Sequence, residues 1–239
     1  MTMRPLFSAA MLIAVVFWVA PASSAQEPLP VLDFQKTISG IPRLPYYRVA
    51  MAQGPDGSVY IAGDDENISV LVKLDSSGKL LWNIGPGGDG VTGVAVDGAG
   101  DVYVSVVDWG NNRTILVKYN VDGHVVRSVV MPNTGGIDSP VAGGVAFDRS
   151  RGILYASQML LDPVTWQPFA IAAAYNSDLE LQNVKTIALG DIFTYHVNVS
   201  LDAEGNAYLG SSGIDAAQQE TFYVAAKYAP GLAAELWAV

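Results

Sequence analysis

The chain has 239 residues, 50% of them hydrophobic, and its 23 acidic against 13 basic side chains give a net charge of −10. This balance argues against nucleic acid as a partner, because phosphate binding requires clustered Lys and Arg. The chain has no cysteine, so hydrophobic burial must hold the fold without disulfides.

The N-terminus predicts export. Arg4 precedes an uncharged apolar run over residues 6–20, and the small residues 22–25 follow it. This pattern is typical of a secretory signal peptide, whereas a transmembrane helix needs about 20 apolar residues. We therefore expect residues 1–25 to be a signal peptide. The mature protein is then expected to be periplasmic or extracellular, with no integral membrane segment.

A repeated pattern fills residues 46–239, after an N-terminal extension over residues 26–45. It is marked by Tyr60, Tyr103, Tyr155 and Tyr208, which are 43, 52 and 53 residues apart. This spacing is the period of a four-stranded propeller blade. Each copy begins with a short strand of small and β-branched residues and turns at an Asp/Gly pair, where Asp bonds the backbone and Gly accepts a positive φ.

The strands of the second copy show the pattern best. They are expected at 93–97, 102–107, 114–119 and 124–130, with a hairpin turn at 120–123 between the last two. Helical periodicity is absent after the signal peptide. We predict an all-β fold, a β-propeller of four four-stranded blades over residues 46–85, 90–130, 140–187 and 194–239.

Two phrases carry a resemblance to a known family. Gly93-Val-Ala-Val-Asp-Gly-Ala-Gly-Asp-Val-Tyr-Val-Ser and Ile115-Leu-Val-Lys-Tyr-Asn-Val-Asp-Gly resemble the bacterial β-propeller repeats called SBBP, which are close to NHL repeats. The resemblance extends over nearly all of residues 46–239. It implies a propeller fold and no particular activity, because such repeats are scaffolds for unrelated functions.

The number of strands leaves ring closure open. Val31 to Ile38 has the pattern of an outer strand, yet Ala233 to Val239 already provides the outer strand of the fourth blade. Either the N-terminal strand lies elsewhere, or the ring is open or incomplete, or two chains associate. An open array leaves a strand edge and an apolar blade face exposed, which favours self-association.

Two sets of charged residues recur at equivalent positions. Asp97, Asp148 and Asp202 are expected to form turns, since recurrence itself favours a structural role. Lys73, Lys118 and Lys227 are expected to lay their stems along the blade and reach solvent or a neighbouring turn acid. The third copy departs from the pattern, with Ala174 in place of the lysine and a longer insertion around Trp166.

Function in a propeller usually resides in the loops at the mouth of its channel. Aromatic rings beside carboxylates and amides suit sugars or other polar ligands, although the alternative for the tryptophans is that they fill gaps between blades. A histidine there is a candidate acid or base, or else a hydrogen-bonded packing residue. The candidate ligand-binding residues are Trp109, Asn112, Arg113, Trp166, Tyr195 and His196.

No catalytic motif is recognisable, so the leading hypothesis is an exported binding module for a protein, glycan or small molecule. No cofactor is expected, with calcium the one alternative; the acidic run 64–66 could attract a cation or be a solvated loop tip. The rival hypothesis is a calcium-dependent hydrolase or lactonase of the gluconolactonase type, for which only Asn198 resembles a ligand in the inner strands. A repeat protein without independent activity is the third.

Overall fold

The computed structural model describes residues 49–65, 68–135, 137–138, 143–188, 192–215 and 221–238. The expected signal peptide, the extension over residues 26–45 and its strand from Val31 to Ile38 lie outside the described residues. The acidic run 64–66 lies partly outside them. In the described part, every regular element is a β-strand except two short 3-10 helices.

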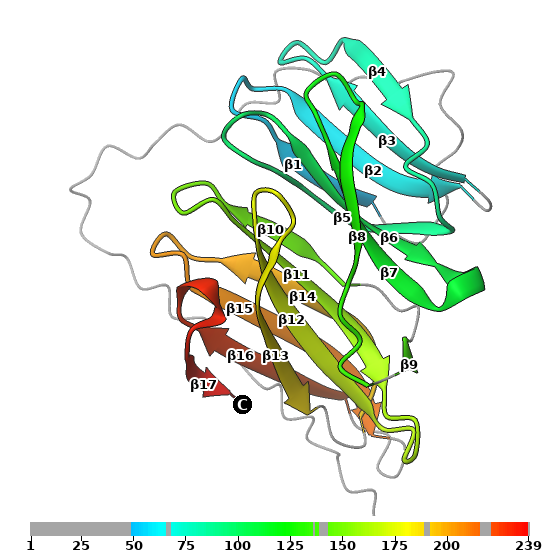
Figure 1. The fold of residues 1–239 in the computed structure, drawn as a ribbon, viewed down its shortest axis with the longest axis vertical. Helices are drawn as coiled ribbons and strands as arrows, with labels where there is room; N and C mark the ends of the chain where they lie inside the picture. Colours follow the sequence, from blue (N-terminus) through cyan, green and yellow to red (C-terminus); the bar gives the residue numbers. More distant parts are fainter. Residues whose placement is uncertain are drawn as a thin grey trace, which may run out of the picture. The chain divides into compact units, whose positions relative to one another are not determined.

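Four antiparallel four-stranded sheets follow one another along the chain, coloured in succession from blue to red in Figure 1. Each is a meander, because its strands pair in chain order. Sheet 1 comprises β1 (Val49–Gln53), β2 (Val59–Asp65), β3 (Ile68–Leu74) and β4 (Leu80–Ile84). Sheet 2 comprises β5 (Gly90–Val96), β6 (Val102–Asp108), β7 (Arg113–Tyr119) and β8 (Val125–Val130), with the 3-10 helix η1 (Trp109–Asn111) between β6 and β7.

The other two sheets have the same plan. Sheet 3 comprises β10 (Val145–Asp148), β11 (Ile153–Leu161), β12 (Pro168–Asn176) and β13 (Leu181–Ala188). A further two-residue strand, β9 (Ile137–Asp138), pairs with the end of β11, which the sequence pattern did not predict. Sheet 4 comprises β14 (Ile192–Leu201), β15 (Ala207–Asp215), β16 (Thr221–Tyr228) and β17 (Glu235–Ala238), with η2 (Pro230–Leu232) before β17. The predicted all-β class and the four four-stranded blades are confirmed.

Both faces of a central sheet are buried, which explains its unbroken apolar strands. In β6, Val102, Val104 and Val106 join the core cluster shared with sheet 1. Tyr103 on the other face joins the cluster shared with sheet 3. A third cluster lies between sheets 3 and 4 and is rich in alanine along β12.

Small residues let neighbouring inner strands approach closely. A Cβ added at Gly93 of β5 would lie 2.9 Å from the backbone nitrogen of Val145, which begins β10. A Cβ added at Gly144 would lie 3.2 Å from the backbone nitrogen of Val199 in β14, and the Gly144 amide donates to the carbonyl of Val197 at 3.1 Å. The small inner-strand residues predicted from the sequence therefore have a steric reason.

Contacts between sheets follow the chain order. Sheet 1 packs on β5 of sheet 2, β5 and β6 pack on β10 of sheet 3, and sheet 3 packs on β14 of sheet 4. Within the described ranges, no packing of similar extent joins sheet 1 to sheet 4. The four sheets thus form an open series and not a closed ring.

Candidate functional site

The recurring aspartates are turn formers, as predicted. The Asp97 carboxylate accepts hydrogen bonds from the amides of Ala99 and Asp101 at 2.8 and 2.9 Å. Asp202 accepts from the amide and the side-chain amide of Asn206, both at 2.8 Å. Burial raises the pKa of Asp202, but these bonds and those from Lys227 and Tyr208 outweigh it and hold the pKa well below 3.8.

The repeated tyrosines and lysines of sheets 1 and 2 join each of these sheets to the next. The Tyr60 hydroxyl donates to the carbonyl of Gly100 in sheet 2 at 3.2 Å, and that of Tyr103 donates to the carbonyl of Ser177 in sheet 3 at 2.8 Å. Lys118 lies over the Tyr103 ring, pairs with Asp101 at 3.0 Å and donates to the same Ser177 carbonyl at 3.0 Å. These residues are connectors and leave no free group for chemistry.

The predicted role of the lysines is confirmed for two of them and different for the third. Lys118 and Lys227 reach turn acids, Asp101 and Asp202. Lys73 is buried and donates instead to the carbonyl of Val121 in sheet 2 at 3.1 Å.

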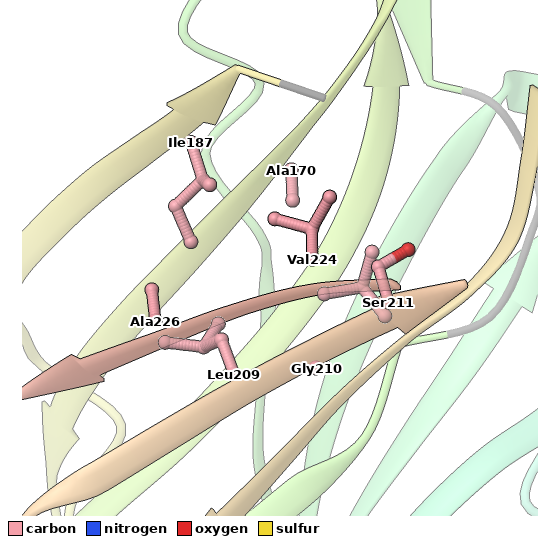
Figure 2. A pocket seen from close by; sticks show the side chains of 8 residues that line it. Ala170, Ile187, Leu209, Gly210, Ser211, Val224 and Ala226 are labelled. Carbon is pink, nitrogen blue, oxygen red and sulfur yellow. The ribbon is translucent and has the colours of Figure 1, made fainter. Parts of the chain in front are cut away.

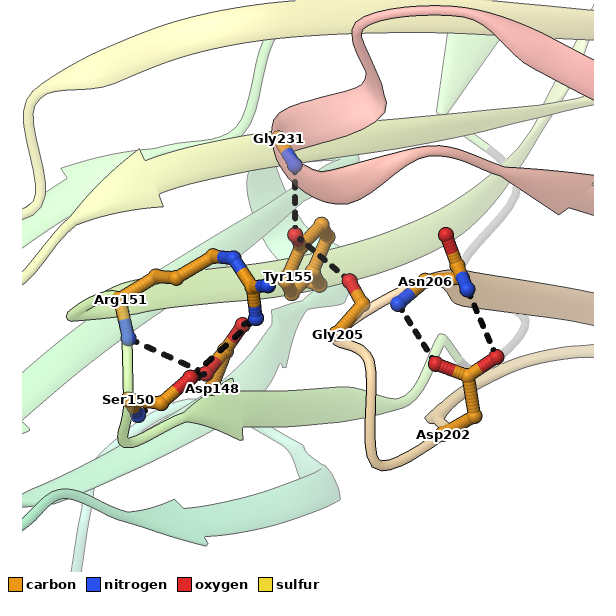
Figure 3. Close-up of polar contacts among 8 residues, drawn as sticks. All are labelled: Asp148, Ser150, Arg151, Tyr155, Asp202, Gly205, Asn206 and Gly231. Carbon is orange, nitrogen blue, oxygen red and sulfur yellow. Dashed lines mark hydrogen bonds and ion pairs between the residues drawn. The ribbon is translucent and has the colours of Figure 1, made fainter.

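The junction between sheets 3 and 4 explains the missing third lysine. Ala174 is opposite Tyr155 in the strand register and packs in one cluster with the fully buried Leu232 of η2. The Tyr155 hydroxyl accepts from the amide of Gly231 at 2.6 Å (Figure 3). Asn183 donates to the carbonyl of Leu232 at 2.8 Å. Leu232 and Asn183 together take the place of a lysine at this junction.

The loop between β6 and β7 presents a tryptophan on a rigid frame. The Asp108 carboxylate accepts from the Asn111 amide at 3.2 Å and from Arg113 Nε at 2.7 Å. The Trp109 amide donates to Asp89 at 2.6 Å, and Asn112 ends η1 in the left-handed region with φ 47°. Bonds from the Asn111 side chain and from Arg113 lower the pKa of Asp108, which keeps the loop's anchor ionised. The Trp109 side chain is 50% exposed.

The equivalent loop of sheet 3, between β11 and β12, is also held by hydrogen bonds to an aspartate. Asp162 accepts from the amides of Val164 and Thr165 at 2.9 and 2.7 Å, and these bonds lower its pKa. Trp166 donates its amide to the Asp162 carbonyl at 2.9 Å, has φ 59° and is 64% exposed. Each loop is therefore built on an aspartate and displays an exposed indole.

The interpretation of these tryptophans as gap fillers is wrong, because both are half or more exposed. No contact between Trp109 and Trp166 is found among the described residues. Tyr195 and His196 lie in β14, the inner strand of sheet 4, but their side chains are outside the described part. The structure thus places Trp109, Asn112 and Arg113 in one loop and Trp166 in the equivalent loop of the next sheet.

Two hollows border sheet 4. The first, between sheets 3 and 4, is an apolar gap of about 10 Å³ beside Ala170, Leu209 and Ala226 (Figure 2). A gap of this size is at most the size of one water molecule, so it is a packing defect and not a ligand site. The second is an open groove of about 410 Å³ on the far face of sheet 4, with Asn198, Ser212 and Tyr223 in its lining.

Within the described ranges, no three His, Asp or Glu side chains gather as metal ligands, and no helix is long and apolar enough to cross a membrane.

Comparison with known proteins gives a fold and no family. No protein family and no curated protein matches the sequence. Among solved structures, the Dos1 propeller matches 81% of this chain and 47% of its own, with a TM-score of 0.53 and 9% identity. The propeller of the Trilobed protease from Pyrococcus furiosus, described as having an open velcro topology, matches 79% of this chain and 57% of its own (TM-score 0.48, 8% identity).

A Bacteroides caccae protein of unknown function is similar over 80% of this chain and 59% of its own (TM-score 0.48, 13% identity). The chain therefore spans about half to three fifths of the length of these structures. The likeness to the Dos1 propeller shows that the four sheets have a β-propeller fold.

Proposed function

We propose that this chain is an exported β-propeller binding module whose ligand rests on the loops 108–113 and 162–167. The observation that carries the proposal is the pair of tryptophans, Trp109 and Trp166, exposed on equivalent loops of neighbouring sheets. An exposed indole is unusual for a side chain that normally buries, and aromatic anchors dominate the affinity of many interfaces.

The construction of the loops supports binding more than it supports packing. Each loop is held by an aspartate that accepts two or more backbone or side-chain hydrogen bonds. A rigid loop loses little conformational entropy when a ligand binds, so an exposed ring on such a loop is preorganised. The predicted export agrees with a ligand met outside the cytoplasm.

The chemistry of the loops favours a polar ligand with apolar faces, such as a glycan. Trp109 offers a flat apolar surface, while Asn112 beside it is exposed and Arg113 is partly exposed. An indole stacks on the apolar face of a sugar ring, and the amide and guanidinium can donate hydrogen bonds to hydroxyl groups.

A glycan array followed by titration of the best hit tests the proposal. Trp109→Ala and Trp166→Ala are each expected to weaken binding about tenfold, as loss of an aromatic anchor does. Leu181→Ser, at another exposed apolar side chain, is the matched control and should bind as the wild type does. Unchanged affinity in the double tryptophan variant would exclude these loops as the site. Calcium-dependent lactone hydrolysis by the wild type would favour the enzyme instead.

A further inference from the structure

A row of three side chains crosses the face of sheet 1 that meets sheet 2. Tyr60, Lys73 and Trp82 are opposite one another in the registers of β2, β3 and β4. Lys73 Nζ and Trp82 Nε1 both donate to the carbonyl of Val121, at 3.1 Å each. Val121 belongs to the turn 120–123 of sheet 2, and Gly123 of that turn lies against the Trp82 ring. The row is therefore a receptor for a hairpin turn of the next sheet.

Sheet 4 carries the same row at the same register. Tyr208, Lys227 and Trp237 are opposite one another in β15, β16 and β17. Lys227 lies 4.8 Å from the centre of the Tyr208 ring and pairs with Asp202 at 3.1 Å, and Trp237 packs edge-on against Tyr208. The row is thus already ordered within its own sheet.

No turn lies against this second row among the residues that the structure describes. The face that carries it is open: Tyr223 is 78% exposed, Trp237 is 42% exposed, and the groove of about 410 Å³ is lined by residues of β14, β15 and β16. On the corresponding faces of sheets 1, 2 and 3, Tyr60, Tyr103 and Tyr155 are all fully buried.

Sheet 1 presents the matching half at the other end of the series. Its turn 75–78 is built like the turn 120–123: the side chain of Asp75 accepts from the amides of Ser77 and Lys79, as that of Asn120 accepts from the amides of Asp122 and His124. The glycines that end the two turns, Gly78 and Gly123, have φ of 78° and 83°.

The inner strand of sheet 1 is also uncovered, while Val70, Val72 and Leu74 of β3 on the same face are only 2–5% exposed. Met51 of β1 is 64% exposed, although Val94 and Val199, at the same register position in sheets 2 and 4, are 6% and 9% exposed because the preceding sheet covers them. The turn 75–78 and the exposed strand β1 are therefore the parts of sheet 1 that match the open face of sheet 4.

We propose that the chain self-associates head to tail, with sheet 1 of a second copy seated on the Tyr208–Lys227–Trp237 face of sheet 4. The turn 75–78 supplies the backbone carbonyl for Lys227 and Trp237, as the turn 120–123 does for Lys73 and Trp82. Tyr223 and Met51 become buried in this contact. Such an interface is heterologous, so it closes into a ring of copies where the rotation allows.

Light scattering after gel filtration tests the association. The wild type is expected to have the mass of two or more chains, while Met51→Glu and Tyr223→Glu each give the mass of one. Both positions are exposed, so neither change should affect folding, which circular dichroism will verify. Leu181→Ser, exposed on β13 of sheet 3, is the matched control and should keep the wild-type mass.

Mixing the two variants distinguishes a second copy from the chain's own first sheet. Met51→Glu keeps its sheet 4 face and Tyr223→Glu keeps its sheet 1, so the mixture should form dimers through one native interface. A wild-type monomer at all concentrations tested would overturn the proposal, including the case in which sheet 1 of the same chain occupies the face. A mixture that stays monomeric would overturn it as well.

Discussion

Tyr60, Tyr103 and Tyr155 occupy the same register position in three successive sheets, and each hydroxyl donates a hydrogen bond to a carbonyl of the following sheet. A tyrosine suits this place because its ring fills the core while its polar tip needs a partner. The sequence shows the period of the tyrosines. It does not show the partners, which belong to another blade 40 to 74 residues away.

Buried tyrosines predict that the protein loses stability in alkali. Burial raises the pKa of Tyr119 from 10.0 to about 12, so the folded state favours the neutral phenol. This contribution to stability is fully present below pH 10 and is lost as the pH rises towards 12. Tyr119→Phe should therefore lose less stability than the wild type over this interval, by on the order of 1–2 kcal/mol in denaturant titrations.

If the unfolding free energies of the wild type and Tyr119→Phe fall in parallel between pH 10 and 12, the raised pKa of Tyr119 is contradicted. Tyr103 and Tyr175 have raised pKa values for the same reason, burial, and remain in both proteins. The difference between the curves therefore reports Tyr119 alone.

The turns are visible in the local sequence and are also contact points between sheets. Gly205 has φ +81°, and an added Cβ would overlap Asp148 and Arg151 of sheet 3. Gly152 has φ +68° with no atom within 4 Å of that position. Gly152→Ala should cost about 1 kcal/mol of unfolding free energy, and Gly205→Ala about 2–4 kcal/mol, since it adds a clash to the same backbone strain. Urea unfolding measures both, and equal losses would show that the contact is absent.

The turns and strands were predictable because their signals are local. Asp97 and Gly100 lie within one turn, and alternation along β6 is visible in the sequence. The exposure of Trp109 and Trp166 was not predictable, because it depends on which side chains of other sheets reach them. For the same reason, the sequence did not predict that Leu232 and Asn183 take the place of the lysine at the junction of sheets 3 and 4. The sequence showed only that the third copy has Ala174 where the other copies have a lysine.

The open series of sheets predicts that a destabilising substitution affects only the sheets near it. Lys73→Met removes the hydrogen bond to Val121 that links sheets 1 and 2. Because each sheet packs mainly on its neighbours in the chain, hydrogen exchange should rise in β1–β4 and stay unchanged in β14–β17. Lys79→Met, an exposed lysine in the same sheet, is the control. An even rise over all sheets would instead indicate one cooperative unit.

The junction of sheets 3 and 4 differs in chemistry from the other junctions, and this difference favours the correct order of sheets during folding. Sheets 1 and 2 contact their successors through a lysine that needs a protruding turn carbonyl, whereas sheet 3 offers Ala174 and Asn183 and needs the shape of η2 with Leu232. A lysine-bearing face placed against η2 would bury its charge beside Leu232, and the turn of sheet 2 placed on Ala174 would leave a void. Near-identical blades are thereby made non-interchangeable, and a folding chain is protected from pairing the wrong neighbours.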